Sequence, residues 1–262
     1  GVSGNTTFSG EIITSTSGTS NLRIGENAGD AIASGGNYNT VVGDEAGTAI
    51  TTGDQNTFVG YASGDAETTG GENTAVGYGS LGSDTTGSRA TAVGRNALAT
   101  QNLTAELNSY NTAFGWSAGE AVTTGIRNTL IGGSAGDALT DADNNTALGY
   151  AALGADTKGS RSVAIGFQAL ATQNFTSSTD SNNVAIGYDS GYSVTTGTLN
   201  TLIGANAGDN ITTGGGNTGV GSAALDDCVG GSSNTAFGIR ALPHVSSGSN
   251  NTGVGNNVGD GL

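Results

Sequence analysis

The sequence predicts an all-β fold, a parallel β-solenoid or β-roll of about fourteen coils that each span about 17 residues. A five-residue phrase, of which Asn73-Thr74-Ala75-Val76-Gly77 is one copy, recurs along the chain. Consecutive copies lie 17 residues apart in ten of thirteen steps, 18 apart in one and 21 apart in two. With 48 glycines, one proline and 5% aromatic residues among 262, the chain suits stacked turns better than one large globular core. We call each coil a rung and the last glycine of each phrase its anchor glycine.

An anchor glycine ends every copy of the phrase. The fourteen are Gly25, Gly43, Gly60, Gly77, Gly94, Gly115, Gly132, Gly149, Gly166, Gly187, Gly204, Gly221, Gly238 and Gly255. Invariance across internal copies predicts a positive φ or a close backbone approach at this corner. Residues 1–20 lack the repeat and are predicted to form an entry segment or cap, with strand fragments at 6–8 and 11–14. Residues 21–262 are predicted to form the solenoid domain.

The first four positions of the phrase predict one strand per rung. The first position is Asn in twelve of fourteen rungs, and we expect these side chains to hydrogen-bond along the axis as stacked amides do. The expected ladder includes Asn56, Asn73, Asn111, Asn128, Asn145, Asn200, Asn217 and Asn234. The second position is usually Thr and the fourth is always large and apolar. Because alternate side chains share a face, positions two and four are expected to form the inner face.

The residues after the anchor glycine predict a packed interior and a second strand. Four residues past it, six rungs carry Leu and the others Gly; most of the Gly rungs place an aliphatic residue seven past the anchor, such as Ile50 or Leu139. Each rung is therefore expected to supply a similar apolar volume from a different corner, as dense packing requires. The rung with Gly64 and Glu67 does not follow this rule. Recurrent Thr-Thr-Gly segments indicate a second short strand followed by a tight corner.

Two four-residue insertions, within 99–104 and 171–176, lie 72 residues apart. They are expected to leave one corner of the stack, four rungs apart, on a face of the kind that often binds ligands. Asn102 and Asn174 in these insertions begin Asn-X-Thr triplets that would accept a glycan in a suitable host.

Charge and rare residues exclude several classes of protein. A net charge of −15 argues against nucleic acid and anionic membranes as partners. No apolar run approaches 18 residues, so no membrane insertion is expected. Cys228 and His244 are the only thiol and imidazole, and they make a poor catalytic pair, so we predict that the chain is not an enzyme. No His/Cys metal cluster and no cofactor site is expected. The alternative is Ca²⁺ on stacked carboxylates, at Asp30, Asp65, Asp137, Asp209 and Asp260.

Aromatic residues directly follow several anchor glycines, outside the inner-face pattern. They are Tyr61, Tyr78, Trp116, Tyr150, Phe167 and Tyr188. They are expected to form a ligand or interchain surface, either stacking against carbohydrate or packing between chains. With the insertions at Asn102 and Asn174, they are the candidate functional residues of this sequence.

The phrases NTAVGYGSL and SVAIGFQAL, over about residues 21–260, resemble the NTAxG repeats of bacteriophage tail-fibre proteins. They are also similar to the NSVAIG-type head repeats of trimeric autotransporter adhesins, whose period is shorter. The resemblance implies a left-handed β-roll that associates as a homotrimer in an extracellular or virion-surface fibre. It also implies a cell-surface glycan or protein receptor as a partner. A cell-surface adhesin or appendage subunit is the alternative. An ice-binding solenoid is a third hypothesis, which the expected inward Thr disfavours.

Overall fold

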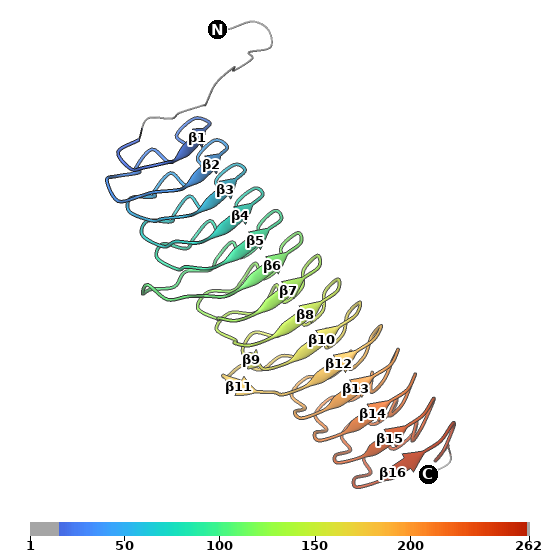
Figure 1. Ribbon diagram of the computed structural model, residues 1–262. Coiled ribbons are helices and arrows are strands. Elements are labelled where there is room, and N and C mark those ends of the chain that lie inside the picture. The colour runs from blue at the N-terminus through green and yellow to red at the C-terminus, as the bar shows by residue number, and fades with distance from the viewer. Residues whose placement is uncertain (1–15, 261–262) are drawn as a thin grey trace, which may run out of the picture.

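A computed structural model describes residues 16–260 as a rod of stacked rungs (Figure 1). The strand fragments expected at 6–8 and 11–14 lie outside the described residues. Fourteen three-residue strands, one per rung, form a long sheet. They are β1 (Leu22–Ile24), β2 (Thr40–Val42), β3 (Thr57–Val59), β4 (Thr74–Val76), β5 (Thr91–Val93), β6 (Thr112–Phe114), β7 (Thr129–Ile131), β8 (Thr146–Leu148), β10 (Val163–Ile165), β12 (Val184–Ile186), β13 (Thr201–Ile203), β14 (Thr218–Val220), β15 (Thr235–Phe237) and β16 (Thr252–Val254).

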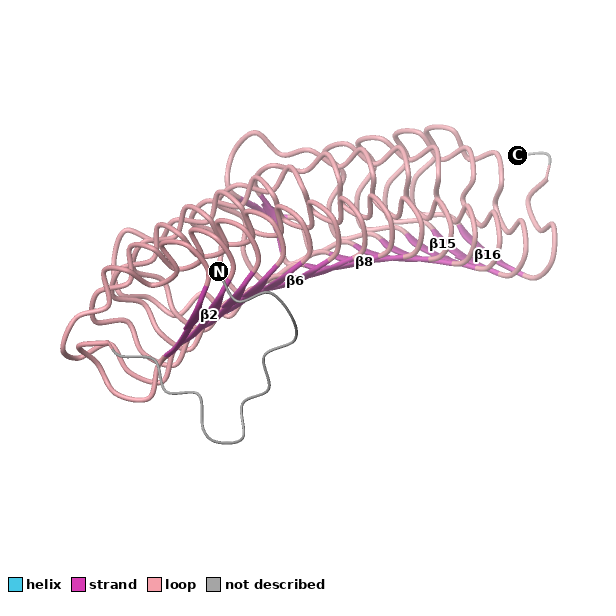
Figure 2. Cartoon of the chain, turned by 90° about the horizontal axis from the view of Figure 1, so that it is seen from above, coloured by secondary structure: helices cyan, strands magenta, loops and turns pink. Residues whose placement is uncertain are grey.

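Every rung lies directly over its predecessor. The strands of the long sheet are parallel and follow one another in chain order, so that Thr74 pairs with Thr91 and Val76 with Val93. The described residues contain no helix. The predicted parallel β-solenoid of about fourteen rungs is therefore confirmed. Figure 2 shows that the rod is curved and that the sheet runs along one of its sides.

The anchor glycines meet both conditions expected of them. Their φ angles run from 130° at Gly60 to 147° at Gly115, a region that side chains disfavour. A Cβ on Gly132 would also lie 2.4 Å from the carbonyl oxygen of Gly149, the anchor of the next rung. The same approach recurs up the stack and ends at Gly255, where nothing lies within 4 Å.

The strand faces are the reverse of those expected, and that prediction was wrong. The third position of the phrase is buried, as at Phe58, Ala75 and Leu130. Positions two and four point outward, and Val254 in the fourth position is 68% exposed. The physical reason is the width of the interior: Leu or other aliphatic side chains from the opposite wall already fill it, so nine of the fourteen rungs carry only Ala or Gly at position three.

The predicted exchange of volume between rungs is confirmed. Leu81 and Leu98 are fully buried in Leu rungs, as are Ile50 and Leu139 in Gly rungs. The rung that broke the rule is now explained in part. A Cβ on Gly64 would lie 2.5 Å from the ring of Phe58, so Phe58 occupies the space that Leu takes elsewhere.

The Asn ladder forms, with a different bond pattern from stacked amides. Asn128 donates from Nδ2 to the carbonyl of Ala142 (2.8 Å), which closes its own rung. Its Oδ1 accepts from the backbone N–H of Asn145 in the next rung (2.9 Å). Amide-to-amide bonds occur as well near the C-terminal end, as from Asn251 to Asn234 (2.9 Å). Each Asn thus joins the two walls of a rung and two successive rungs.

The Thr-Thr-Gly segments form bends, so the predicted second strand is wrong for most rungs. The N–H groups of Thr51 and Gly53 both donate to the carbonyl of Thr68, which turns the chain instead of extending it. Strand pairing on this side occurs where the insertions fold back. β9 (Gly159–Ser160) pairs with β11 (Thr179–Asp180), and Ser88 forms the equivalent bridge with Asn108. Figure 1 shows both insertions on the same side of the rod, as expected.

Candidate functional site

The residue after each anchor glycine points out of the rod beside the C-terminal ends of the strands. We call residues 61, 78, 95, 116, 133, 150, 167 and 188 the aromatic column, because six of these eight are aromatic. The register of the sheet places them one above another in consecutive rungs. Their rings are exposed, from 42% at Phe167 to 55% at Trp116, Tyr150 and Tyr188. The predicted aromatic surface is therefore a single line of side chains.

Five of the six rings stack on a neighbouring ring along this line, all except Trp116. The ring centroids of Tyr61 and Tyr78 lie 5.3 Å apart. Phe167 is sandwiched, with its centroid 5.6 Å from that of Tyr150 and 5.4 Å from that of Tyr188. Because stacked rings cover one another's faces, few ring faces remain free for a sugar to stack against. The geometry thus disfavours a carbohydrate stripe along the whole column.

Two of the eight column residues, Arg95 and Gly133, are not aromatic. The sequence analysis did not identify them, although their place directly after an anchor glycine is the signal that could have done so. The guanidinium of Arg95 lies 5.4 Å from the ring centroid of Tyr78, so it continues the stack as a cation–π contact. Gly133 has no side chain, which leaves one empty level between Trp116 and Tyr150. A Cβ there would meet only the Tyr150 ring, at 3.4 Å.

An apolar strip lies beside the column on the outer face of the long sheet. It is formed by the fourth position of the phrase, and Phe114 and Phe237 there are 57% and 58% exposed. A column of mostly Thr, the second position, runs parallel to it. We call these two columns together the outer sheet face. Exposed apolar area that continues over many rungs is typical of an interaction surface.

Carboxylates adjoin the column. Glu45 hydrogen-bonds to the hydroxyl of Tyr61 and raises its pKa above the usual value near 10, because the charge opposes ionisation of the phenol. Asp189 raises the pKa of Tyr188 in the same way. Near Gly133, the hydroxyl of Ser134 hydrogen-bonds to Asp137, whose pKa is raised chiefly by burial.

Asn102 and Asn174 hold the insertions to the rungs below and do not join the column. Asn102 accepts from the hydroxyl of Thr85 (3.1 Å), and Asn174 accepts from that of Thr157 (3.0 Å). Neither has a ring contact with the column in the described structure. The candidate residues therefore belong to two separate features, a line of rings and a pair of insertions.

Buried polar side chains support the insertions from inside, which the sequence did not lead us to expect. Asp84 and Asp156 are fully buried at the position where Gly rungs carry an aliphatic residue. Asp156 accepts from the Gln173 amide (2.6 Å) and from the backbone N–H of Gly159 (3.0 Å) and Phe175 (3.1 Å). Their place in the repeat could have revealed this, because the equivalent position in most Gly rungs holds a buried aliphatic side chain.

Glu67 is buried at the same level of the repeat, next to Asp84. Burial, followed by the charge of Asp84, raises its pKa from 4.5 to about 8. Its carboxylate accepts from the N–H groups of Thr68 (3.1 Å) and Gly70 (2.7 Å) and from the Asn73 amide (3.2 Å). Glu67 is thus mostly neutral at pH 7.

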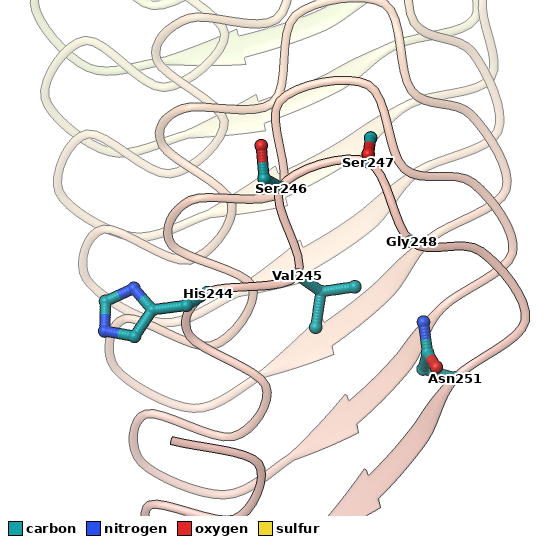
Figure 3. A pocket seen from close by; sticks show the side chains of 6 residues that line it. All are labelled: His244, Val245, Ser246, Ser247, Gly248 and Asn251. Atoms are coloured by element: carbon teal, nitrogen blue, oxygen red, sulfur yellow. The ribbon is translucent and has the colours of Figure 1, made fainter. Parts of the chain in front are cut away.

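Cys228 and His244 do not approach each other. The thiol is buried against the carbonyl of Gly231 (3.6 Å), and burial raises its pKa. The imidazole of His244 is exposed and contacts Asp227 (Nδ1 to Oδ2, 2.8 Å) and Asp260 (Nε2 to Oδ1, 3.4 Å). Figure 3 shows a hollow near this end of the rod, with the His244 ring turned away from Val245 and Asn251. The hollow is lined by His244, Val245, Ser246, Ser247, Gly248 and Asn251.

Among residues 16–260, no group of three or more His, Cys, Asp or Glu side chains is placed to hold a metal ion. The carboxylates considered for Ca²⁺ stand singly or in pairs. Asp209 shares a hydrogen bond with Asp226, and burial together with this contact raises its pKa to about 7. No helix within the same residues is long and apolar enough to cross a membrane.

Comparison of the chain with models of protein families, with curated proteins and with solved structures finds no match.

Proposed function

We propose that the chain is a structural, non-enzymatic segment of an extracellular fibre, in which three copies associate as a left-handed homotrimeric shaft. Fourteen rungs in strict register make a rod whose length grows with each repeat, which suits a spacer. The resemblance to tail-fibre repeats adds the trimer, the hand of the coil and a place on a virion or cell surface. A surface glycan or a receptor protein is the proposed external partner, with the insertions as its nearest contacts.

One observation carries this proposal: the outer sheet face has an apolar side chain at the fourth position of every rung, and none of these side chains is buried. Ile24, Leu148 and Val254 lie in different thirds of the rod and are 50%, 43% and 68% exposed. A monomeric soluble protein rarely leaves so long an apolar strip in contact with water. Association of rods along this face would cover it.

Light scattering after size-exclusion chromatography tests the proposal directly. We expect three times the chain mass, and elongated particles in negative-stain micrographs. The double variant Phe114→Thr/Leu148→Thr keeps strand-favouring residues but removes apolar contact, and we expect it to dissociate more readily. Leu199→Thr is the matched control, because Leu199 is 62% exposed but lies outside the strip. A wild-type rod that is folded and monomeric at every concentration contradicts the proposal.

A cell-surface adhesin or appendage subunit remains the alternative with the same architecture. Both roles use a rod that presents a distal surface, so the geometry fits each. The genes beside the parent gene separate them, because virion genes favour a tail fibre and secretion genes favour an adhesin.

Ice binding gains support from the orientation of Thr. We disfavoured it on the expectation that Thr faces inward, and Thr74, Thr91 and Thr129 instead face outward on a parallel sheet. Regular hydroxyls at about 4.8 Å intervals form a repetitive surface for ordered water. Phe114 and Phe237 project from the same face and break its flatness. Thermal hysteresis in a dilute solution supports this function, and freezing at the equilibrium temperature excludes it.

A further inference from the structure

The aromatic column lacks a side chain of its own at Gly133, where a Cβ would meet only the ring of Tyr150, at 3.4 Å. Trp116 lies one rung before it and Tyr150 one rung after it. Two rungs span about 10 Å, so a group midway lies about 5 Å from each ring. That is the spacing that the column itself uses, at 5.3 to 5.6 Å between ring centroids.

The column already accepts a guanidinium as one of its members. Arg95 occupies the same position two rungs before Gly133 and stacks 5.4 Å from the ring centroid of Tyr78. A cation within about 6 Å of an aromatic ring centroid is attracted to the ring face. A guanidinium between Trp116 and Tyr150 would meet two such faces where Arg95 is seen against one.

Charge favours a cation over a neutral ring at this level. Asp137 hydrogen-bonds to the hydroxyl of Ser134, the residue after Gly133, and Glu120 is close enough to Asp137 to raise its pKa. The chain carries a net charge of −15, so a cation is drawn toward the rod from a distance. Trp116 and Tyr150 are each 55% exposed, so the level opens to solvent.

We propose that the level over Gly133, between Trp116 and Tyr150, binds one guanidinium group. The residues that form the site all belong to one rod, so the site does not depend on the proposed fibre role. The group comes either from an external ligand or from an arginine of a second copy. Arg127 is the candidate in the second case, because its exposed guanidinium has no side-chain partner in the described structure and it lies six residues before Gly133, at the other end of β7.

The only tryptophan of the chain lines the site, so its indole reports on binding. Methylguanidinium is titrated into the whole chain at constant ionic strength while Trp116 fluorescence and its indole N–H resonance are recorded. We expect a saturable change in the millimolar range. Methylammonium, which is cationic but not planar, and N-methylurea, which is planar but neutral, should each bind at least fivefold more weakly.

The variant Gly133→Tyr fills the level and serves as the matched control. Gly133 has no positive φ, and Tyr is native to this position in four other rungs, so the fold should persist. We expect the saturable change to be lost. If Gly133→Tyr does not give the wild-type circular dichroism spectrum, Gly133→Leu replaces it as a filling variant. An equal response from wild type and a folded filling variant overturns the proposal.

Arg127→Gln distinguishes the two sources of the group. If Arg127 of a second copy fills the level, methylguanidinium binds the variant more tightly than the wild type. If the source is external, the two bind alike. Absence of saturable binding in both overturns the proposal, and so does saturable binding of methyl glucoside in place of methylguanidinium, which would assign the level to a sugar.

Discussion

Gly132 lies at a corner where two successive rungs come close together, and its missing side chain permits that approach. A Cβ there would lie 2.4 Å from the carbonyl oxygen of Gly149, and the φ of 133° is itself unfavourable for alanine. We expect Gly132→Ala to cost about 3 kcal/mol or more of unfolding free energy, from backbone strain and overpacking together. Denaturant titration followed by circular dichroism measures this.

Two alanine variants separate the causes. Gly255 has a φ of 134° but nothing within 4 Å, so Gly255→Ala carries backbone strain without the contact. Gly133 has neither, and Gly133→Ala should change stability by less than about 0.5 kcal/mol. Equal losses at Gly132 and Gly133 would show that close approach does not limit the stack.

Glu67 makes the stability of the rod depend on pH. Its pKa in the folded chain is about 8, above the unfolded value near 4.5, so the folded state binds more protons between these values. Its contribution is therefore complete below pH 4.5 and is lost as the pH rises toward 8. We expect the unfolding free energy to fall across this window by an amount of the order of a few kcal/mol.

Glu67→Gln should flatten this dependence, because an amide cannot ionise. Asp209, with its pKa raised to about 7, gives a smaller slope of the same sign that the variant retains. Glu106→Gln is the control, since Glu106 is exposed. Thermal melts at pH 4.5, 6 and 8 make the comparison. An unchanged slope in Glu67→Gln means that Glu67 is not neutral in the folded rod.

Each insertion is an element anchored by a buried carboxylate. All three groups that Asp156 contacts are donors: the Gln173 amide, at 2.6 Å, and two backbone N–H groups. In Asp156→Asn an amide N–H₂ must face at least one of these donors, which costs about 1–3 kcal/mol. We expect faster hydrogen exchange at Phe175 and across 171–182, with the distant rungs unchanged.

Asp180→Asn is the matched control in the same insertion. Asp180 pairs with Arg161 at 2.6 Å, but both side chains are exposed, so the pair contributes little. Asp84→Asn should reproduce the effect of Asp156→Asn at 99–110, because Asp84 accepts from Gln101 and Leu103 in the same way. Exchange in Asp156→Asn that matches the control contradicts the anchoring role.

The sequence repeat predicts the features that depend on its period, but not those that depend on the width of the rod's interior. The strand before each anchor glycine, the positive φ of these glycines and the exchange of Leu for another aliphatic residue follow from the repeat, whereas the second strand expected at the Thr-Thr-Gly segments does not form in most rungs. The strand faces were not predicted correctly. The alternation of side chains assigns the more hydrophobic set to the inside and takes no account of side-chain size. Ala75 and Ala92 face a narrow interior, whereas Val76 faces outward and is kept by its strand propensity.

The candidate site, too, was predictable from the sequence only in part. The aromatic column was predictable because its residues share one place in the repeat. The stacking of its rings was not predictable, because ring orientation depends on the three-dimensional structure. Gly133 can be interpreted as a gap in the column only once the neighbouring rings are known to stack. The interior carboxylates stand at a position of the repeat that other rungs fill with an aliphatic side chain, but burying a charge is costly, so the sequence alone did not predict that they are buried.

The whole rod behaves as a chain of nearest neighbours, since each strand pairs only with the strands of adjacent rungs. Residues 73–144 and 145–216 are equivalent at an offset of 72, so removing 73–144 joins Glu72 to Asn145 in phase. Asp156 would then follow Glu67 as Asp84 does now, and Leu153 would replace Leu81. Every buried neighbour has an equivalent.

We therefore expect the shortened chain to fold as a solenoid that is four rungs shorter, by about 19 Å. Small-angle scattering measures this as a smaller maximum dimension with an unchanged cross-section. Removing 73–147 is the control: it takes Asn145, Thr146 and Ala147 as well, so the strand of that rung is lost and the register above it is broken. This control should aggregate or melt earlier. Equal behaviour of the two deletions would mean that the stack does not depend on rung-to-rung register, and the cooperative unit would then be something other than the rung.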